Sequence, residues 1–595
     1  MLFSLIVAAG LMTQPADTLQ AVTVVADRGV VVSRTDTVKI QPLLDVGSSL
    51  LYFPGLYVGD YGGLAGLKSA SLRGLGSAHT AIYLDGIRVG NVQSGQADLG
   101  FIDLQSMENV VVDYAQNSLS FNTARPVFVN GRPVSGTVRF NAGSFSTWQP
   151  YGRVNFRLNE RMSISAYAGG VITKGDFPLA DGTRRLNNDL KQIKAGMDYF
   201  ADIKGGDIHA KLLYHGSDRG TPGSVSWPST DRQTDRNFLA QAMLRKSFTP
   251  VYTLNLNAKG SYDQLLYKSE WGDSDYNQTE LQINSAHKFR IIPWWEVSLA
   301  ADFSYDGLKS NLYNQKRHGT VWAAATAFRT ARFKADLAVE YAGVFDLGGS
   351  SWNSISPSAD VRFTIVPGLD ILAFGRRAYR TPTFNELYYP GYGNPQLKPE
   401  DAWLTDLGLD FHRTFGGLTL EARVDGYYNY LTNKIISAPS ADDPNIWLPY
   451  NVGKVQAVGA DVLVGANYLT DGGWLFGCTV RYGYQNAVDK TPDSYTFDQT
   501  IPYVAKHSVL VNPVVGWKGW KLGVNWNLRA GRRDSVGEMP NWNTLDAQLA
   551  KEFRFAGCVL ELSVMGRNLT DCRYDMVSGY PMPGRSVIGG ISFAF

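Results

Sequence analysis

Hydrophobic and polar residues alternate along most of the chain from about residue 136 onward. In the segment 153–158 the valine, phenylalanine and leucine share one face, and the arginines and asparagine share the other. The same period of two recurs in 333–341 and in 418–425. Because successive side chains of a β-strand point to opposite faces, this pattern predicts strands with one apolar and one polar face. Both a soluble β-sandwich and a transmembrane β-barrel have such strands, so the alternation alone does not separate them.

The connections between the predicted strands separate these two architectures. Most of the short turn motifs contain glycine, proline or asparagine, whose backbone preferences suit tight hairpins. They lie at 159–160, 205–206, 249–250, 292–293, 330–331, 366–368, 416–417, 471–473, 518–519 and 556–557. Longer polar stretches alternate with them, at 173–189, 217–236, 269–280, 380–401, 429–450 and 488–502. With one strand at each end, these turns predict about 22 antiparallel strands with tight turns on one side and long loops on the other, as in outer-membrane barrels.

The composition favours the barrel. Of the 595 residues, 44% are hydrophobic, 12% aromatic and only 18% charged, whereas soluble domains carry about 25% charged residues. The apolar content excludes intrinsic disorder, and no apolar run reaches the roughly 20 residues of a membrane-spanning helix. A net charge of +2 gives no basic field for nucleic acid. Tryptophans close to the short turns suit an interfacial aromatic girdle: Trp294, Trp295, Trp474, Trp517 and Trp520.

The chain divides into four predicted segments. Residues 1–16 are interpreted as a signal peptide whose apolar core is Leu2 to Met12, although no basic residue precedes it and a first buried strand is the alternative. Residues 17–30 form a linker, 31–135 a globular domain and 136–595 the barrel. A barrel of this size has a wide lumen, which the globular domain is expected to fill as a plug. The three cysteines are too few for a disulfide scaffold and are predicted to be unpaired.

Several segments, in this order, resemble the TonB-dependent outer-membrane receptors. The plug-like segments are 53–58, 71–74 and 82–89, and the barrel-like segments are 379–388, 393–400, 568–571, 583–585 and the final Phe595. A TonB box is identified at Leu19, Gln20, Ala21, Val22, Thr23, Val24 and Val25, with a strand of the plug as the alternative. An exposed β-rich segment can pair with a partner strand. The resemblance implies active transport across a Gram-negative outer membrane, energised by TonB with ExbB and ExbD.

The resemblance also assigns structural roles within the plug: Arg73, Gly74, Asp85, Gly86 and Arg88. Asp85 and Gly86 stand between two short apolar runs and predict a hairpin turn on their own. Both arginines are expected to be buried between plug and barrel wall, where a charge needs a partner. Glu421 and Asp425 on the inward face of the barrel are candidate partners. The segment 110–140 departs from the family pattern, so the last plug strands are expected to differ.

The segment 90–99 resembles the plug apex loop of the family's vitamin B12 receptors. Its amides can hydrogen-bond the amide rim of a corrinoid, and its glycine permits close approach. The predicted ligand-binding residues are Asn91, Val92, Gln93, Ser94, Gly95 and Gln96, with Tyr61 from the neighbouring glycine-rich segment 59–67. Cobalamin uptake is the leading prediction, and ferric siderophore or haem uptake is the alternative, as is a plug loop without ligand contact. The resemblance also points to a Bacteroidetes-type receptor, in which a surface lipoprotein lid captures ligand above the barrel.

Motifs for two further functions give weaker signals. Asp273 and Asp275 alternate with polar residues in a predicted loop, which suits calcium, although a solvated acidic loop is the alternative. No GxxxxGK[ST] phosphate loop and no GxSxG elbow in a strand-turn-helix context occurs, and the histidines show no zinc spacing. The sequence therefore predicts a transporter rather than an enzyme, with a passive pore and a barrel enzyme as remaining alternatives.

Overall fold

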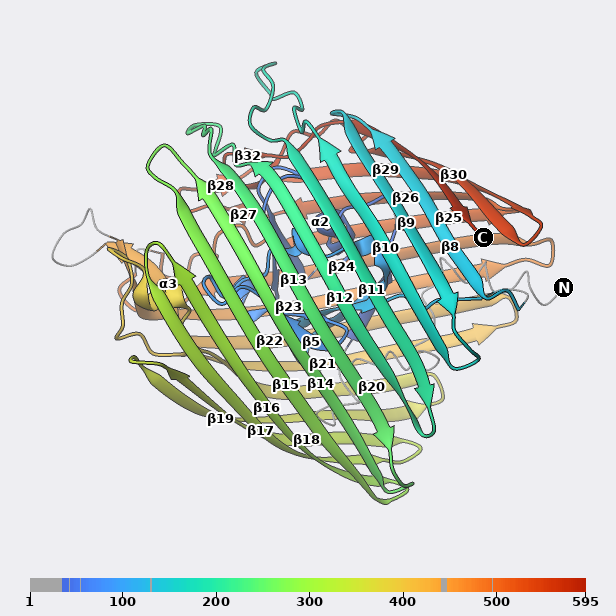
Figure 1. Cartoon of the computed structure of the whole chain (residues 1–595), viewed down its shortest axis with the longest axis horizontal. Coiled ribbons are helices and arrows are strands. Elements are labelled where there is room, and N and C mark those ends of the chain that lie inside the picture. Colours follow the sequence, from blue (N-terminus) through green and yellow to red (C-terminus); the bar gives the residue numbers. More distant parts are fainter. Residues whose placement is uncertain (1–34, 42, 54, 129–130, 440–446, 495) are drawn as a thin grey trace.

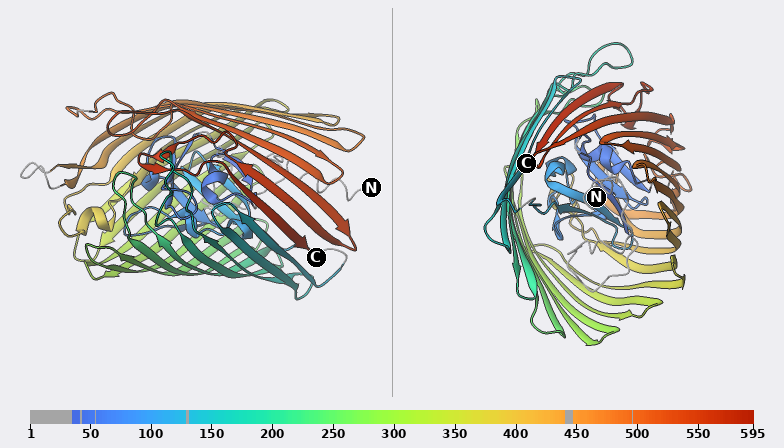
Figure 2. Two further views of the ribbon diagram at one scale, coloured as in Figure 1. Left: turned by 90° about the horizontal axis from the view of Figure 1, so that it is seen from above. Right: turned by 90° about the vertical axis from the view of Figure 1, so that its right-hand side faces the viewer.

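A closed β-barrel surrounds a small plug domain. The computed structural model describes residues 35–41, 43–53, 55–128, 131–439, 447–494 and 496–595. Within these ranges, 22 antiparallel strands form the barrel, and Figure 2 shows the plug inside its lumen. The predicted fold class is confirmed. The predicted signal peptide (1–16), the linker (17–30) and the TonB box lie outside the described residues.

Alternation along the strands is inverted relative to a soluble protein. Phe156 and Leu158 are 45% and 55% exposed, whereas Arg153 and Asn155 in the same segment are 8% and 7% exposed. The same inversion occurs on a distant strand, where Asp336 is buried and its neighbour Leu337 is exposed. Apolar side chains therefore face outward, where lipid surrounds them, and polar side chains face the lumen. This is the arrangement of a transmembrane barrel.

The strands of the barrel wall run around it in chain order, and the last strand pairs with the first (Figure 1). They are β8 (Val134–Gly143), β9 (Thr147–Arg157), β10 (Met162–Thr173), β11 (Leu190–Ile203), β12 (Gly206–Gly220), β13 (Arg232–Ser247), β14 (Tyr252–Lys268), β15 (Ser274–Ile292), β16 (Trp295–Ser310), β17 (Asn314–Arg329), β18 (Phe333–Asp346), β19 (Ser351–Val366), β20 (Leu369–Arg380), β21 (Glu400–Phe415), β22 (Leu418–Pro439), β23 (Trp447–Leu469), β24 (Trp474–Asp489), β25 (His507–Trp517), β26 (Trp520–Ala530), β29 (Trp542–Phe555), β30 (Cys558–Arg567) and β33 (Ser586–Ala594).

All ten predicted short turns join neighbouring strands. The predicted strict alternation with long loops is wrong, because the connections 144–146, 311–313 and 347–350 on the opposite edge are also short. The predicted loop 429–450 is wrong as well, since β22 and β23 continue through most of it. A strand that projects beyond the membrane needs no apolar face, so its polar sequence resembles a loop.

Short elements occupy the long connections. They are α3 (Phe384–Tyr388) and the two-stranded pairs β27 (Arg532–Arg533) with β28 (Glu538–Met539) and β31 (Asp575–Val577) with β32 (Tyr580–Pro581). Among the described residues, no helix is long and apolar enough to cross a membrane. The three cysteines are unpaired, as predicted.

The plug contains a sheet with the strand order β1-β6-β7-β4-β5 and a separate hairpin of β2 and β3. Its elements are β1 (Thr35–Lys39), α2 (Val46–Leu50), β2 (Leu56–Asp60), β3 (Lys68–Leu72), η3 (Ser77–His79), β4 (Ala81–Leu84), β5 (Ile87–Val89), η4 (Leu99–Phe101), η5 (Leu104–Ser106), β6 (Met107–Asp113) and β7 (Ser118–Thr123). Leu50, Phe53 and Phe121 are fully buried in its core. The segment that departs from the family pattern forms the β6–β7 hairpin, with Asn117 at a φ of 49°.

Candidate functional site

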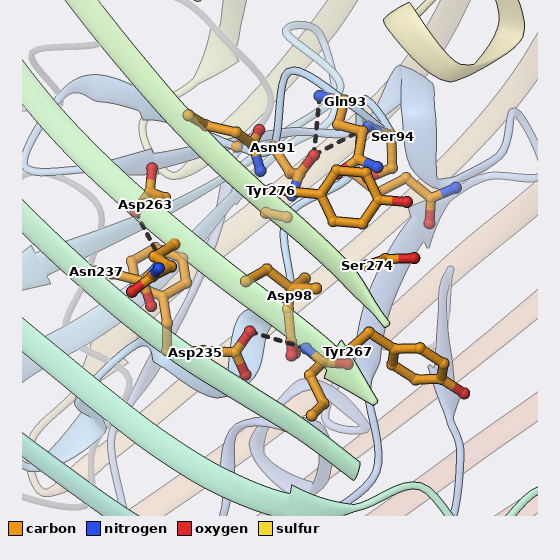
Figure 3. A pocket seen from close by; sticks show the side chains of 18 of the residues that line it. Asn91, Gln93, Ser94, Asp98, Asp235, Asn237, Asp263, Tyr267, Ser274 and Tyr276 are labelled. Atoms are coloured by element: carbon orange, nitrogen blue, oxygen red, sulfur yellow. Dashed lines mark hydrogen bonds between the residues drawn. The ribbon is translucent and has the colours of Figure 1, made fainter. Parts of the chain in front are cut away.

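A cavity of about 730 Å³ separates the plug loop 90–98 from the barrel wall. The wall side consists of residues of β12, β13, β14 and β15, and the lining also includes Asn385 of α3 (Phe384–Tyr388) and Tyr389 directly after it. Figure 3 shows Asn91, Gln93 and Asp98 of the plug close to Asn237, Asp263 and Tyr276 of the barrel. A volume of several hundred Å³ with convergent polar groups is typical of a ligand site.

The plug loop is held in shape by its own hydrogen bonds. The side-chain oxygen of Asn91 accepts the backbone N–H groups of Gln93 and Ser94, both at 2.9 Å. The backbone N–H of Gly95 donates to the Asn91 carbonyl at 2.7 Å. Gly95 has a φ of +72° and a Cβ there would lie 2.5 Å from the Thr383 methyl group. Both the backbone conformation and the close approach require glycine.

The predicted ligand-binding residues separate into two groups. Asn91, Gln93, Ser94 and Gln96 line the cavity. Val92 instead packs against the apolar cluster of Tyr276, Leu308 and Phe384, and Gly95 lies against Thr383. Tyr61 lies outside this cavity, where its ring contacts that of Tyr580 with centroids 5.0 Å apart. The polar side chains of the loop therefore face the cavity, and Val92 anchors the loop by packing against the apolar cluster.

Helix α3 holds the plug loop in place through a backbone hydrogen bond. The backbone N–H of Asn385 donates to the Gln93 carbonyl at 3.0 Å, and the Tyr313 hydroxyl donates to the Asn385 side chain at 2.6 Å. Thr383 begins the helix with a capping box closed by Glu386. The family-like segment 379–388 thus positions one wall of the cavity.

The base of this segment is tied to the plug by charged groups. Arg380 bonds Glu386 at 3.0 Å and Glu400 at 2.6 Å. Glu400 also contacts the imidazole of His79 in the plug, and both side chains are buried. The long loop, the barrel wall and the plug therefore share one polar network.

The barrel wall contributes charged and amide groups that the sequence did not identify. Arg219 pairs with Asp98 at 2.8 Å, and Lys259 pairs with Glu280 at 2.6 Å. The carboxylate of Asp263 accepts a hydrogen bond from Asn237 at 2.7 Å. Burial raises the pKa of Asp98, but the Arg219 guanidinium and the backbone N–H of Gly100 outweigh it and hold this pKa below its usual value.

The charges of the cavity do not balance. Two cations, Arg219 and Lys259, face five carboxylates, namely those of Asp98, Asp235, Asp263, Asp273 and Glu280. The excess of carboxylates favours neutral or cationic ligands over anionic ones. Side-chain amides supply the remaining polar groups and offer both donors and acceptors.

His215 also lines the cavity, but both of its ring nitrogens have partners. One lies 3.0 Å from the Gln192 amide and the other 2.7 Å from the Asn237 side chain. It is thus placed neither as a general base nor as a metal ligand. In the described part of the chain, no group of three or more His, Cys, Asp or Glu side chains could hold a metal ion.

The predicted calcium residues lie at the start of β15. Asp275 accepts a hydrogen bond from the Asn277 amide at 3.1 Å, and the backbone of both aspartates is bonded to Asn311. Asp273 lines the cavity, whereas Asp275 does not. Calcium binding at this pair stays a prediction.

Arg73 lies on a different side of the plug and is buried, 2% exposed. It bonds Asp406 on β21 at 2.7 Å and Asp461 on β23 at 2.9 Å. Its guanidinium lies between the rings of Tyr114 and Tyr427, each centroid 4.2 Å away. These ion pairs form on either side of β22, the strand that carries the expected partners Glu421 and Asp425. Gly74 follows with a φ of +76° and would clash with Gln485 if it carried a Cβ.

The predicted hairpin turn at Asp85 and Gly86 joins β4 to β5, with positive φ at both residues. Asp85 is buried beside Lys211 of the wall, at 3.3 Å. The expectation that Arg88 is buried is wrong, because this side chain is exposed. On β5, Ile87 and Val89 are buried and Arg88 lies between them, so the alternation of the strand points its side chain away from the plug core.

Two family models match the chain. The model described as TonB dependent receptor-like, beta-barrel matches residues 136–569, and the TonB-dependent Receptor Plug Domain matches residues 15–127. Among curated proteins, the chain is 23% identical over 587 residues to a vitamin B12 transporter BtuB of Photobacterium profundum, covering 94% of this chain and 91% of the relative. It is 21% identical over 458 residues to the vitamin B12 transporter BtuB of Vibrio vulnificus, covering 72% and 70%.

Solved structures share the fold at low sequence identity. The copper transporter OprC superposes with a TM-score of 0.78 at 15% identity, covering 94% of this chain and 98% of that one. The unliganded ferric citrate transporter FecA has a TM-score of 0.76 at 14% identity, covering 95% and 97%. These neighbours support the architecture and leave the cargo open. With the barrel model matching most of its length, the chain belongs to the TonB-dependent receptors, transport proteins of the Gram-negative outer membrane and not enzymes.

Proposed function

We propose that this receptor takes up a corrinoid, of the cobalamin type, through TonB-dependent transport. The observation that carries the proposal is the cavity beside the plug loop 90–98, which is lined by side-chain amides and has more carboxylates than cations. A corrinoid has a rim of uncharged amide arms, and cobinamide also carries positive charge on its cobalt. Amide donors and acceptors of the cavity suit such a rim.

The alternative cargo is a ferric siderophore or haem. Ferric citrate and haem carry carboxylates, and the excess of acidic groups in the cavity opposes an anionic ligand. The relatives named as vitamin B12 transporters align along most of the chain. They support the same choice.

Purified receptor incubated with cobinamide and then desalted is expected to retain visible corrinoid absorbance in proportion to the protein. Ferric citrate, tested in the same way, is expected to pass through. Absence of corrinoid colour on the desalted protein would refute the proposed cargo. Retention of ferric citrate alone would replace the corrinoid with an iron chelate.

Energy coupling is proposed to act through the TonB box at Leu19 to Val25, pulled by TonB with ExbB and ExbD. Deletion of residues 19–26 is expected to abolish uptake of labelled cobalamin by cells while purified protein still binds it. Unchanged uptake would contradict the assigned box and favour a passive pore. A surface lipoprotein lid and loop calcium are proposed as additional partners. Co-purification with the receptor tests the lipoprotein, and chelation before the binding assay tests the calcium.

A further inference from the structure

The floor of the cavity combines polar groups, namely Asn91, Gln93 and Gln96 of the plug and Asp263 of the wall, with apolar ones such as Val89 and Phe101 of the plug. Three connections on the long-loop edge, at the mouth of the cavity, also contribute apolar or aromatic side chains to the lining: Trp271, Leu312 and Tyr389. A site of this kind offers a ligand both apolar contact area and hydrogen-bonding groups.

Trp271 is the most exposed of these residues, at 94%. Tryptophan is on average highly buried in folded proteins, so an indole in this position lacks its usual environment. The described part of the chain shows no hydrogen bond from the indole and no ring contact to it. By contrast, Tyr389 at the same mouth has a ring neighbour in Tyr313, with centroids 6.1 Å apart.

The backbone around Trp271 is well anchored. The Ser269 hydroxyl accepts the backbone N–H of Trp271 at 3.2 Å and donates to the Gly272 carbonyl at 2.9 Å. The carbonyl of Asp273 accepts a hydrogen bond from the Asn311 side chain at 2.8 Å. The connection therefore holds its shape while the indole at its tip is exposed at the cavity.

We propose that Trp271 stacks on the flat conjugated ring of the cargo at the mouth, while the amide arms on one edge of that ring contact the plug loop 90–98. This inference rests on the corrinoid function proposed above and specifies how the cargo lies. The ligand class is a planar macrocycle with uncharged arms. Stacking on an indole supplies apolar contact area without demanding a specific polar group. The carboxylates that line the cavity would repel a macrocycle whose arms end in carboxylates.

Trp227 provides a matched control. It is also highly exposed, at 80%, and it lies on the neighbouring connection 221–231, but it does not line the cavity. A general effect of removing an exposed tryptophan from these loops would therefore appear in both variants. An effect of stacking would appear only at Trp271.

The test measures cobinamide affinity of the full receptor by equilibrium dialysis with visible absorbance. Trp271→Ala is expected to weaken binding about tenfold, Trp271→Phe to retain most of the affinity, and Trp227→Ala to bind like the wild type. Tryptophan fluorescence should fall when cobinamide binds, and Trp271→Phe should lose part of that decrease. Equal affinity of Trp271→Ala and wild type would overturn the inference and leave the corrinoid function standing. No binding by the wild type would instead overturn the function itself.

A second probe tests the orientation. The same corrin with its amide arms hydrolysed to carboxylates is expected to bind the wild type at least about tenfold more weakly than cobinamide. Equal affinity for the two probes would show that the arms do not face the acidic floor and would overturn the proposed orientation.

Discussion

Arg73 and the loop 90–98 both lie where the plug meets the barrel wall, but their polar groups are satisfied in different ways. Arg73 is enclosed by two carboxylates and two tyrosine rings. The loop satisfies its backbone through the Asn91 side-chain oxygen and leaves the side-chain amides of Gln93 and Gln96 at the cavity. The first arrangement fixes the plug in the lumen, and the second leaves hydrogen-bonding capacity for a ligand. One interface thus contains an anchor and a binding surface.

The largest effect is expected at the anchor. Arg73→Ala leaves Asp406 and Asp461 buried without this cation, and breaking a buried pair in this way costs about 3–5 kcal/mol. Limited proteolysis and thermal unfolding of the purified receptor should show a loosened plug. Arg88→Ala is the control, because this exposed arginine of the same domain should change stability by less than about 0.5 kcal/mol. Equal effects of the two substitutions would contradict the anchor.

A smaller effect is expected at the binding surface. Gly95→Ala adds a Cβ at positive φ and against Thr383, which should strain the loop by about 1–2 kcal/mol and weaken cobinamide binding about tenfold. Gly76→Ala is the matched control, since its φ is +101° but no atom lies within 4 Å of the added Cβ. Strain alone would affect the stability of both variants, whereas loss of affinity should be confined to Gly95. A wild-type affinity in Gly95→Ala would show that the contact with Thr383 does not shape the site.

The smallest effect is expected from one cavity charge. Asp263→Asn removes a carboxylate that has an amide partner, so the hydrogen bond can persist while the charge is lost. Affinity for cationic cobinamide should fall about fivefold at low salt, corresponding to about 1 kcal/mol, and the difference should shrink as salt is added. Asp181→Asn, on an exposed part of the β10–β11 connection outside the cavity, should have no effect. A gain in affinity at Asp263 would show that the cargo presents negative charge there.

The sequence predicts the barrel well because each strand is a local pattern. Ten turns follow from hairpin chemistry, and the hairpin at Asp85 and Gly86 follows from its dipeptide. The partners of Arg73 could not be found in this way, because Asp406 and Asp461 are 333 and 388 residues away and their alignment depends on how the plug is rotated in the lumen. Arg88 is exposed between the buried Ile87 and Val89, so the alternation along β5, and not the family resemblance, indicates its environment.

The candidate site was predicted in part for the same reason. The plug side, Asn91 to Gln96, follows from a local resemblance. The wall side, including Asn237 and Asp263, belongs to the inward polar face that every barrel strand has, so no local signal distinguishes the strands beside the loop. Polar side chains at the long-loop end of β12 to β15 could have been proposed only once the position of the loop was known.

The seam between β33 and β8 has a consequence for how the molecule assembles. The backbone groups of Gly136 and Phe595 bond each other in both directions, and the Val587 N–H reaches the Ser144 hydroxyl across 443 residues of chain. Until β33 pairs with β8, the wall is an open sheet with two unpaired edges, which invite pairing with other chains. The plug precedes β8 directly, so it must be enclosed when this seam closes or enter afterwards through the short-turn end. Pairing of β33 with β8 is thus the step that closes the open sheet into a barrel with an enclosed lumen.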